Sequence, residues 1–342
     1  MSKSTKSLKR IFKYAILFII IFGVLLTFTN LKHLKQHFFE INLCYFILTL
    51  SSAFVVYLIE GIFLLFSLRL YKEELALLHA FRYSLIINSV GYFVSLGGIT
   101  PFATQIHVLD HHNISVQKAT ASRVIQVIFF NFFFILLLLI GLISILTHYP
   151  KSIFSVPIII ITVSFFFLLI SAFYLSIFWK PFQKVAARGL FNFLNSVVRV
   201  FTKKVRFDQK WAENLLNEFH NGFRIIIRTP HSLITLFLIS LIDWVFWISV
   251  MYFSFFAMNY SIHPGALIIG FSIGQLVGIL SMMPGGAGTM EGAMALVYTS
   301  LGIPLATAVG VIVLYRLAFY IIPFLVSIPF YFSLKHKSQD LN

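Results

Sequence analysis

The sequence of 342 residues is short of charge and contains a single cysteine. Charged residue types make up 11% of it, whereas hydrophobic types make up 59% and the mean hydropathy is +0.92. Several apolar runs also reach the ~20 residues that a helix needs to cross a bilayer. We therefore expect an all-α polytopic membrane protein. The one cysteine, Cys44, excludes an internal disulfide.

Acidic residues are scarcer than basic ones, with 11 Asp and Glu against 26 Lys and Arg and a formal net charge of +15. No basic stripe is interleaved with exposed aromatic residues, so no nucleic-acid partner is expected. The basic residues gather at the N-terminus, near Arg69 and Lys118, over 180–228 and in the C-terminal tail. The positive-inside rule then predicts a cell-membrane protein with both termini cytoplasmic. Membrane lipids are the expected partners, with the basic face on an anionic leaflet, and a homo-oligomer is left open.

Six apolar runs predict six full transmembrane helices within a single integral membrane domain, residues 1–342. Two further stretches, about 80–112 and 264–302, are interrupted by glycine and proline, and we expect them to form re-entrant helical hairpins. The segment 180–229 is basic with apolar residues at every fourth position, which is typical of amphipathic helices on a cytoplasmic membrane surface. The six expected spans cover residues 11–29, 43–68, 120–146, 156–178, 230–256 and 305–332.

The second interruption combines one proline with several glycines. Pro284 has no N–H, and Gly285, Gly286 and Gly288 permit any φ, so the chain can turn sharply there. If the basic loops share one side, the two hairpins enter from opposite sides, as in an inverted repeat, and meet near the bilayer midplane. The glycine amides are then candidates to cradle a phosphate. Close helix packing is the alternative use of these glycines.

Ionisable residues at membrane depth are functional candidates by default. Glu291 is placed either to cap the helix that leaves the glycine-rich break or to pair with Arg316 as a gate or head-group clamp. Glu60 and Asp243 are either packing residues or proton-coupling sites. Arg123 is either a third possible coupling residue or, because it lies near the expected end of its span, a side chain that snorkels to the interface.

No cofactor or metal is expected. A group of histidines near one aspartate has the i, i+4 spacing of a metal site on a helix, but it has no clear third ligand. Its members are His107, Asp110, His111 and His112.

A motif near the C-terminus comprises Pro284 to Gly288 with Glu291, Leu301 to Pro304, Ala308 and Tyr315-Arg316. This motif resembles the membrane-domain family of lysylphosphatidylglycerol synthases, a flippase-like family. An earlier block, Thr100-Pro101 with Ile114-Ser115 and Ala119, resembles the family's other signature. There the chain departs from the pattern, because Phe102 to Gln105 stands where members carry Gly-Gly-Glu or Gly-Gly-Gln.

The resemblance implies translocation of a lipid, often one with a charged head group, between leaflets. Substrate-binding candidates are then the residues of both blocks. Lipid aminoacylation is not expected, because the sequence ends at Asn342 without the soluble transfer domain. A membrane enzyme acting on a lipid-linked substrate and a non-transporting scaffold for envelope biogenesis are the alternatives. The substrate-binding candidates are Thr100, Pro101, Gln105, Pro284, Gly285, Gly286, Gly288, Glu291 and Arg316.

Overall fold

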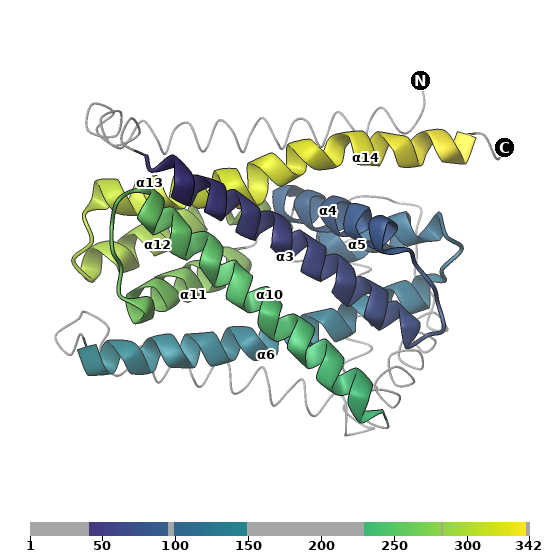
Figure 1. The fold of residues 1–342 in the computed structure, drawn as a ribbon, viewed down its shortest axis with the longest axis horizontal. Helices are drawn as coiled ribbons and strands as arrows, with labels where there is room; N and C mark the ends of the chain where they lie inside the picture. The colour runs from purple at the N-terminus through teal and green to yellow at the C-terminus, as the bar shows by residue number, and fades with distance from the viewer. Residues whose placement is uncertain (1–40, 95–98, 149–228, 282, 340–342) are drawn as a thin grey trace.

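The structure is a computed structural model that describes residues 41–94, 99–148, 229–281 and 283–339 (Figure 1). Every regular element within these ranges is a helix, as the sequence predicts. The expected spans 11–29 and 156–178 lie outside the described residues, as does the expected amphipathic segment up to residue 228.

Four described helices are long and apolar enough to cross a membrane. They are α3 (Leu43–Arg69), α6 (Val116–His148), α10 (Pro230–Ala257) and the continuous run Leu305–Ser333. Helix α3 begins at Leu43 because Asn42 precedes it and its side-chain oxygen accepts a hydrogen bond from the Cys44 amide at 3.1 Å. Helix α10 begins with proline, which tolerates the first helical position. Four of the six expected spans are thereby confirmed as helices of spanning length.

The last span contains a wide turn that the sequence did not predict. It consists of α13 (Leu305–Arg316), the π-helical turn η2 (Leu317–Ile321) and α14 (Ile322–Gln339). Pro323 has no N–H to donate to the carbonyl of Phe319, four residues earlier, and the hydroxyl of Tyr57 on α3 donates to that carbonyl at 2.9 Å. The turn is therefore stabilised by a hydrogen bond from a neighbouring span.

The variant Tyr57→Phe tests this contribution. Because Tyr57 and Phe319 are both fully buried, removal of the hydroxyl leaves a carbonyl without that donor, and we expect a loss of about 1–3 kcal/mol in the free energy of unfolding. Unfolding by SDS in mixed micelles measures the loss. The same substitution at Tyr252, whose side chain is exposed on α10, is the matched control and is expected to change little. Equal losses of stability for Tyr57→Phe and Tyr252→Phe would contradict a stabilising role for the Tyr57 hydroxyl.

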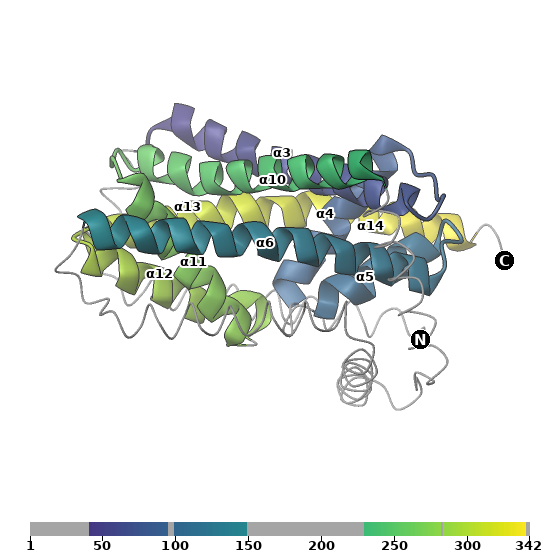
Figure 2. The same ribbon diagram turned by 90° about the horizontal axis from the view of Figure 1, so that it is seen from below.

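Two pairs of short helices fold back on themselves, one at each end of the molecule (Figures 1 and 2). The first pair is α4 (Leu77–Val94) and α5 (Ile99–Asp110), and the second is α11 (Pro264–Leu280) and α12 (Thr289–Ser300) with the short helix η1 (Pro284–Gly286) between them. The turn η1 contacts α4, so the two pairs meet inside the molecule. Helix α5 begins at Ile99, which places Thr100 and Pro101 within its first turn.

Small residues allow the second pair to pack closely. Along α11, a glycine at every fourth position faces a large side chain of α12, and a Cβ atom at any of the three would crowd that side chain. The close packing of α11 against α12 thus depends on the glycines of α11 and not on the glycine-rich turn alone. The facing pairs are Gly270 with Tyr298, Gly274 with Met294 and Gly278 with Met290.

Candidate functional site

A cavity of about 360 Å³ lies where the two helix pairs meet. Its wall combines residues of both pairs with residues of α3, α6, α10 and η2. Gly91 and Pro101 of the first pair line it, and a side chain at Gly91 would crowd the proline ring at 2.6 Å, so the glycine permits that approach. The second pair contributes Gln275, Gly278, Gly285 and Gly286 among others.

One wall of the cavity is aromatic. The rings of Phe130 and Trp244 lie 4.5 Å apart between centroids, and Trp244 and Trp247 lie 5.6 Å apart. The indole N–H of Trp244 donates to the carbonyl of Phe130 at 3.0 Å, which joins α10 to α6 and fixes the ring. This wall offers a rigid apolar surface to a ligand.

Another wall carries a chain of polar contacts. Arg123 donates from Nη1 to Asn88 Oδ1 at 3.1 Å and to Gln126 Oε1 at 2.8 Å. Asn88 in turn donates from Nδ2 to Glu60 Oε2 at 2.5 Å. Arg123 therefore points to the interior and lines the cavity, which corrects the snorkelling interpretation. Asn88 could not be identified from the sequence, because it lies 28 and 35 positions from its two partners.

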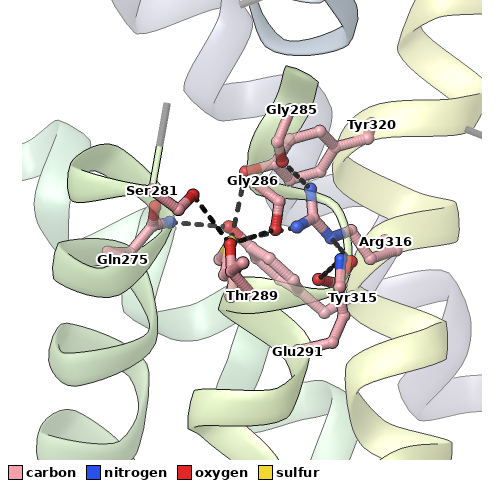
Figure 3. A network of polar contacts seen from close by, with 11 residues as sticks. Gln275, Ser281, Gly285, Gly286, Thr289, Glu291, Tyr315, Arg316 and Tyr320 are labelled. Atoms are coloured by element: carbon pink, nitrogen blue, oxygen red, sulfur yellow. Dashed lines mark hydrogen bonds and ion pairs between the residues drawn. The ribbon is translucent and has the colours of Figure 1, made fainter. Parts of the chain in front are cut away.

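Glu291 and Arg316 form a buried ion pair, with 2.7 Å between Oε1 and Nε (Figure 3). Glu291 Oε2 also accepts a hydrogen bond from the amide of Gly288, the N-cap of α12, at 2.8 Å. The sequence left two roles open for Glu291, a helix cap and an ion pair, and the residue has both: Oε2 caps α12 and Oε1 pairs with Arg316. The carboxylate ties the start of α12 to the last span.

The same arginine holds the glycine-rich turn. Nη1 of Arg316 donates to the carbonyl of Gly285 at 3.0 Å, and its guanidinium carbon lies 4.1 Å from the ring centroid of Tyr320 (Figure 3). Gly285 and Gly286 both have φ of 63°, a region that side chains disfavour, so the turn requires glycine there.

The cavity wall contains the turn but not the ion pair behind it. Gly285 and Gly286 line the cavity, whereas Glu291 and Arg316 are absent from the described lining residues. The pair therefore positions the lining turn, and a direct clamp on a ligand is not what this geometry offers. Tyr320 stacks on Arg316 and also lines the cavity, so it connects the ion pair to the cavity.

Other predicted site residues lie elsewhere. Gln105 is buried and donates from Nε2 to the Ala119 carbonyl at 2.9 Å and to Ser122 Oγ at 2.8 Å, which holds α5 against α6. Thr100 and Gly288 are not among the described residues that line the cavity, and Pro284 begins η1. Asp243 lines a second, much smaller cavity beside Glu60.

The histidine group near α5 makes hydrogen bonds within its own hairpin. His112 Nε2 lies 2.6 Å from the hydroxyl of Tyr83, and His111 Nδ1 lies 3.0 Å from the carbonyl of His107. Within the described ranges, no three His, Cys, Asp or Glu side chains are grouped as a metal site.

Most of the described lining residues were missed by sequence reasoning, and three of them carry polar groups next to the site. Gln126, Gln275 and Tyr320 each interrupt an apolar run, which is a weak signal on its own. Gln275 donates to the hydroxyl of Tyr315 at 3.2 Å, next to the arginine that holds the turn (Figure 3). Only the fold shows that all three face one space.

The fold and the cavity define a helical multi-span membrane protein with a cavity between two short helix pairs, lined by aromatic residues and by a few polar and charged ones. The family model for the lysylphosphatidylglycerol synthase TM region matches residues 8–327, and the chain belongs to that family.

Relatives match over parts of their length. A UPF0104 membrane protein of Methanothermobacter thermautotrophicus is 32% identical over 108 residues, which are 30% of this chain and 32% of the relative. Another from the same organism is 24% identical over 193 residues, 56% of each protein. A phosphatidylglycerol lysyltransferase of Staphylococcus aureus is 29% identical over 91 residues, 27% of this chain and 11% of that protein. The chain thus covers less than two thirds of each of these relatives.

Proposed function

We propose that the protein translocates a lipid with a charged head group between the leaflets of the cell membrane. The observation that carries this proposal is the cavity between two opposed helix pairs, with charged and amide groups on one wall and aromatic rings on another. A head group needs polar contacts inside a bilayer, whereas acyl chains can remain in the hydrocarbon. A volume of 360 Å³ is in the range of small-ligand pockets and suits a head group.

The proposal includes the topology. We take the α4–α5 and α11–α12 pairs as re-entrant hairpins of an inverted repeat, which enter from opposite sides. In support, the loops after α3 and α5 and the start of α10 lie at one end of the molecule, and the loops after α10 and α12 lie at the other (Figure 1). Arg69 and Lys118 mark the first end, which we assign to the cytoplasm with both termini and an anionic leaflet.

The name of the staphylococcal relative supports a phospholipid substrate. That protein is a phosphatidylglycerol lysyltransferase, and the similarity extends over 91 residues of this chain. Within our proposal, the shared part handles a lipid, and no transferase activity is carried over to this chain.

Blocking the cavity with one large side chain tests the proposal. Val127 on α6 lines the cavity and is 37% exposed, so tryptophan can project into the space without burying a polar group. In proteoliposomes with fluorescent anionic, cationic and zwitterionic lipids, we expect wild-type protein to exchange at least one class between leaflets. We expect Val127→Trp to reduce that exchange to the protein-free background.

Leu136 provides the matched control for this experiment. It lies on the same helix, is 39% exposed and does not line the cavity, so Leu136→Trp is expected to exchange lipids at the wild-type rate. Absence of exchange by folded wild-type protein for all three lipid classes would reject translocation. That result would favour a membrane enzyme on a lipid-linked substrate or a scaffold.

A further inference from the structure

Two buried carboxyl groups face a small cavity between α3, α6 and α10. Glu60 on α3 is 4% exposed and Asp243 on α10 is 5% exposed, and both line a space of about 10 Å³. Gln126 and Ser240 also line this space, and the rest of its wall is apolar, with Ile59, Phe63, Phe130 and Ile239. Two carboxylates in such surroundings repel each other and are poorly solvated, so both cannot be ionised without compensation.

The compensation in the structure suffices for one of the two carboxyl groups. Glu60 accepts the hydrogen bond of Asn88, which is itself held by Arg123, so a positive charge supports ionised Glu60. Asp243 is different: within the described part of the chain, its Oδ1 is buried and has no hydrogen-bond partner. An ionised oxygen in that position is costly, whereas a protonated carboxyl group is tolerated.

Other nearby charges do not alter this balance. Among the described residues that line either cavity, Arg123 is the single cation. Arg316 is paired with Glu291, and the nearby phenols, Tyr57 and Tyr320, are neutral in their ordinary form. One arginine, linked to Glu60 through Asn88, is thus set against two buried carboxyl groups, and the three groups together are neutral when one carboxyl group holds a proton.

We propose that Glu60 and Asp243 form a proton-binding site, and that an anionic phosphate group entering the main cavity binds together with one further proton. Glu60 lines both cavities, so it connects the site to the ligand space. When a phosphate engages Arg123, Glu60 loses its counter-charge and takes up a proton from the cavity water. The negative charge of the phosphate is then balanced by the proton, and release reverses both steps. The link to lipid transport rests on the proposed function, but the proton site does not.

Protonation of the acid pair is measured without transport. In infrared difference spectra at neutral pH, wild-type protein is expected to show the C=O band of a protonated carboxylic acid, which Asp243→Asn removes. Ser240→Ala, in the same small cavity but without a titratable group, is the matched control and retains the band. Identical spectra for wild type and Asp243→Asn would overturn the proton site.

The coupling between proton uptake and phosphate binding is measured by lipid binding to the protein in detergent. We expect the affinity for short-chain phosphatidylglycerol to fall with rising pH, by up to about tenfold per unit for one linked proton. Glu60→Gln removes the group that takes up the proton, so its affinity is expected to be independent of pH, while Asp243→Asn keeps the dependence. Inorganic phosphate in parallel shows whether a free anion suffices or the lipid is required.

The outcomes separate this inference from the proposed function. Linked binding without leaflet exchange would reject translocation and leave the proton site standing. Exchange with binding that is independent of pH in the wild type would reject the linkage, as would absence of binding by either phosphate probe.

Discussion

Replacing Arg316 with methionine is expected to lower the free energy of unfolding by about 3–5 kcal/mol. The guanidinium is fully buried and pairs with Glu291 at 2.7 Å, so its loss leaves a buried carboxylate without a cation. The Gly285 carbonyl loses its donor as well. Thermal and SDS unfolding of purified protein measure the change. Since the turn lines the cavity, we expect lipid exchange to fall together with stability.

A second ion pair of the same length provides the control. Lys118 and Glu73 are also 2.7 Å apart, but their side chains are 31% and 27% exposed. Lys118→Met is expected to cost less than about 1 kcal/mol, because water screens the pair and solvates the remaining carboxylate. Adding Glu291→Gln to Arg316→Met is expected to recover part of the loss, because it removes the stranded charge. Equal losses at Arg316 and Lys118 would contradict the role of burial.

A methyl group at Gly270 is expected to destabilise the protein by about 1–3 kcal/mol. An alanine Cβ there overlaps the ring of Tyr298, which is fully buried and hydrogen-bonded to the carbonyl of Leu267 at 3.2 Å, so the ring cannot move aside freely. Gly292 is also in this helix pair, but a Cβ there meets nothing within 4 Å. Gly292→Ala is therefore expected to be neutral or slightly stabilising, since alanine favours helix. Unfolding of both variants in parallel measures how closely α11 and α12 pack. Equal stability of Gly270→Ala and Gly292→Ala would contradict the close contact at Gly270.

Sequence reasoning found the elements whose signals are local. Runs of apolar residues located the four described spans, and the proline and glycines located the turn at 284–288. Glu291 was identified because a carboxylate in the first turn of a helix has a physical purpose in any fold. Each of these signals lies within a few neighbouring residues, so no knowledge of the tertiary structure was needed.

The contacts between distant segments could not be predicted. Glu60 and Asp243 face one small cavity although 182 residues separate them in the chain, and an apolar span does not show which of its faces meets which neighbour. Arg123 was predicted to lie at the membrane interface because the sequence shows its depth along the span. The sequence does not show whether its side chain points to the lipid or to the interior of the protein. The π-helical turn was missed because Pro323 predicts a disturbance but not the residue from α3 that stabilises it.

That turn also shifts the angular phase of the last span. Successive residues of an α-helix are about 100° apart, and one additional residue in a turn rotates all that follows by that amount. Before the turn, α13 packs on α10 and α12, and after it, α14 packs on α4. A regular helix with the same sequence would present a different face to one of these partners. The additional residue in the π-helical turn thus lets a single span contact both helix pairs. Deletion of one residue within 317–321 would rotate one half of the span, so that its contact surface no longer faces its partner.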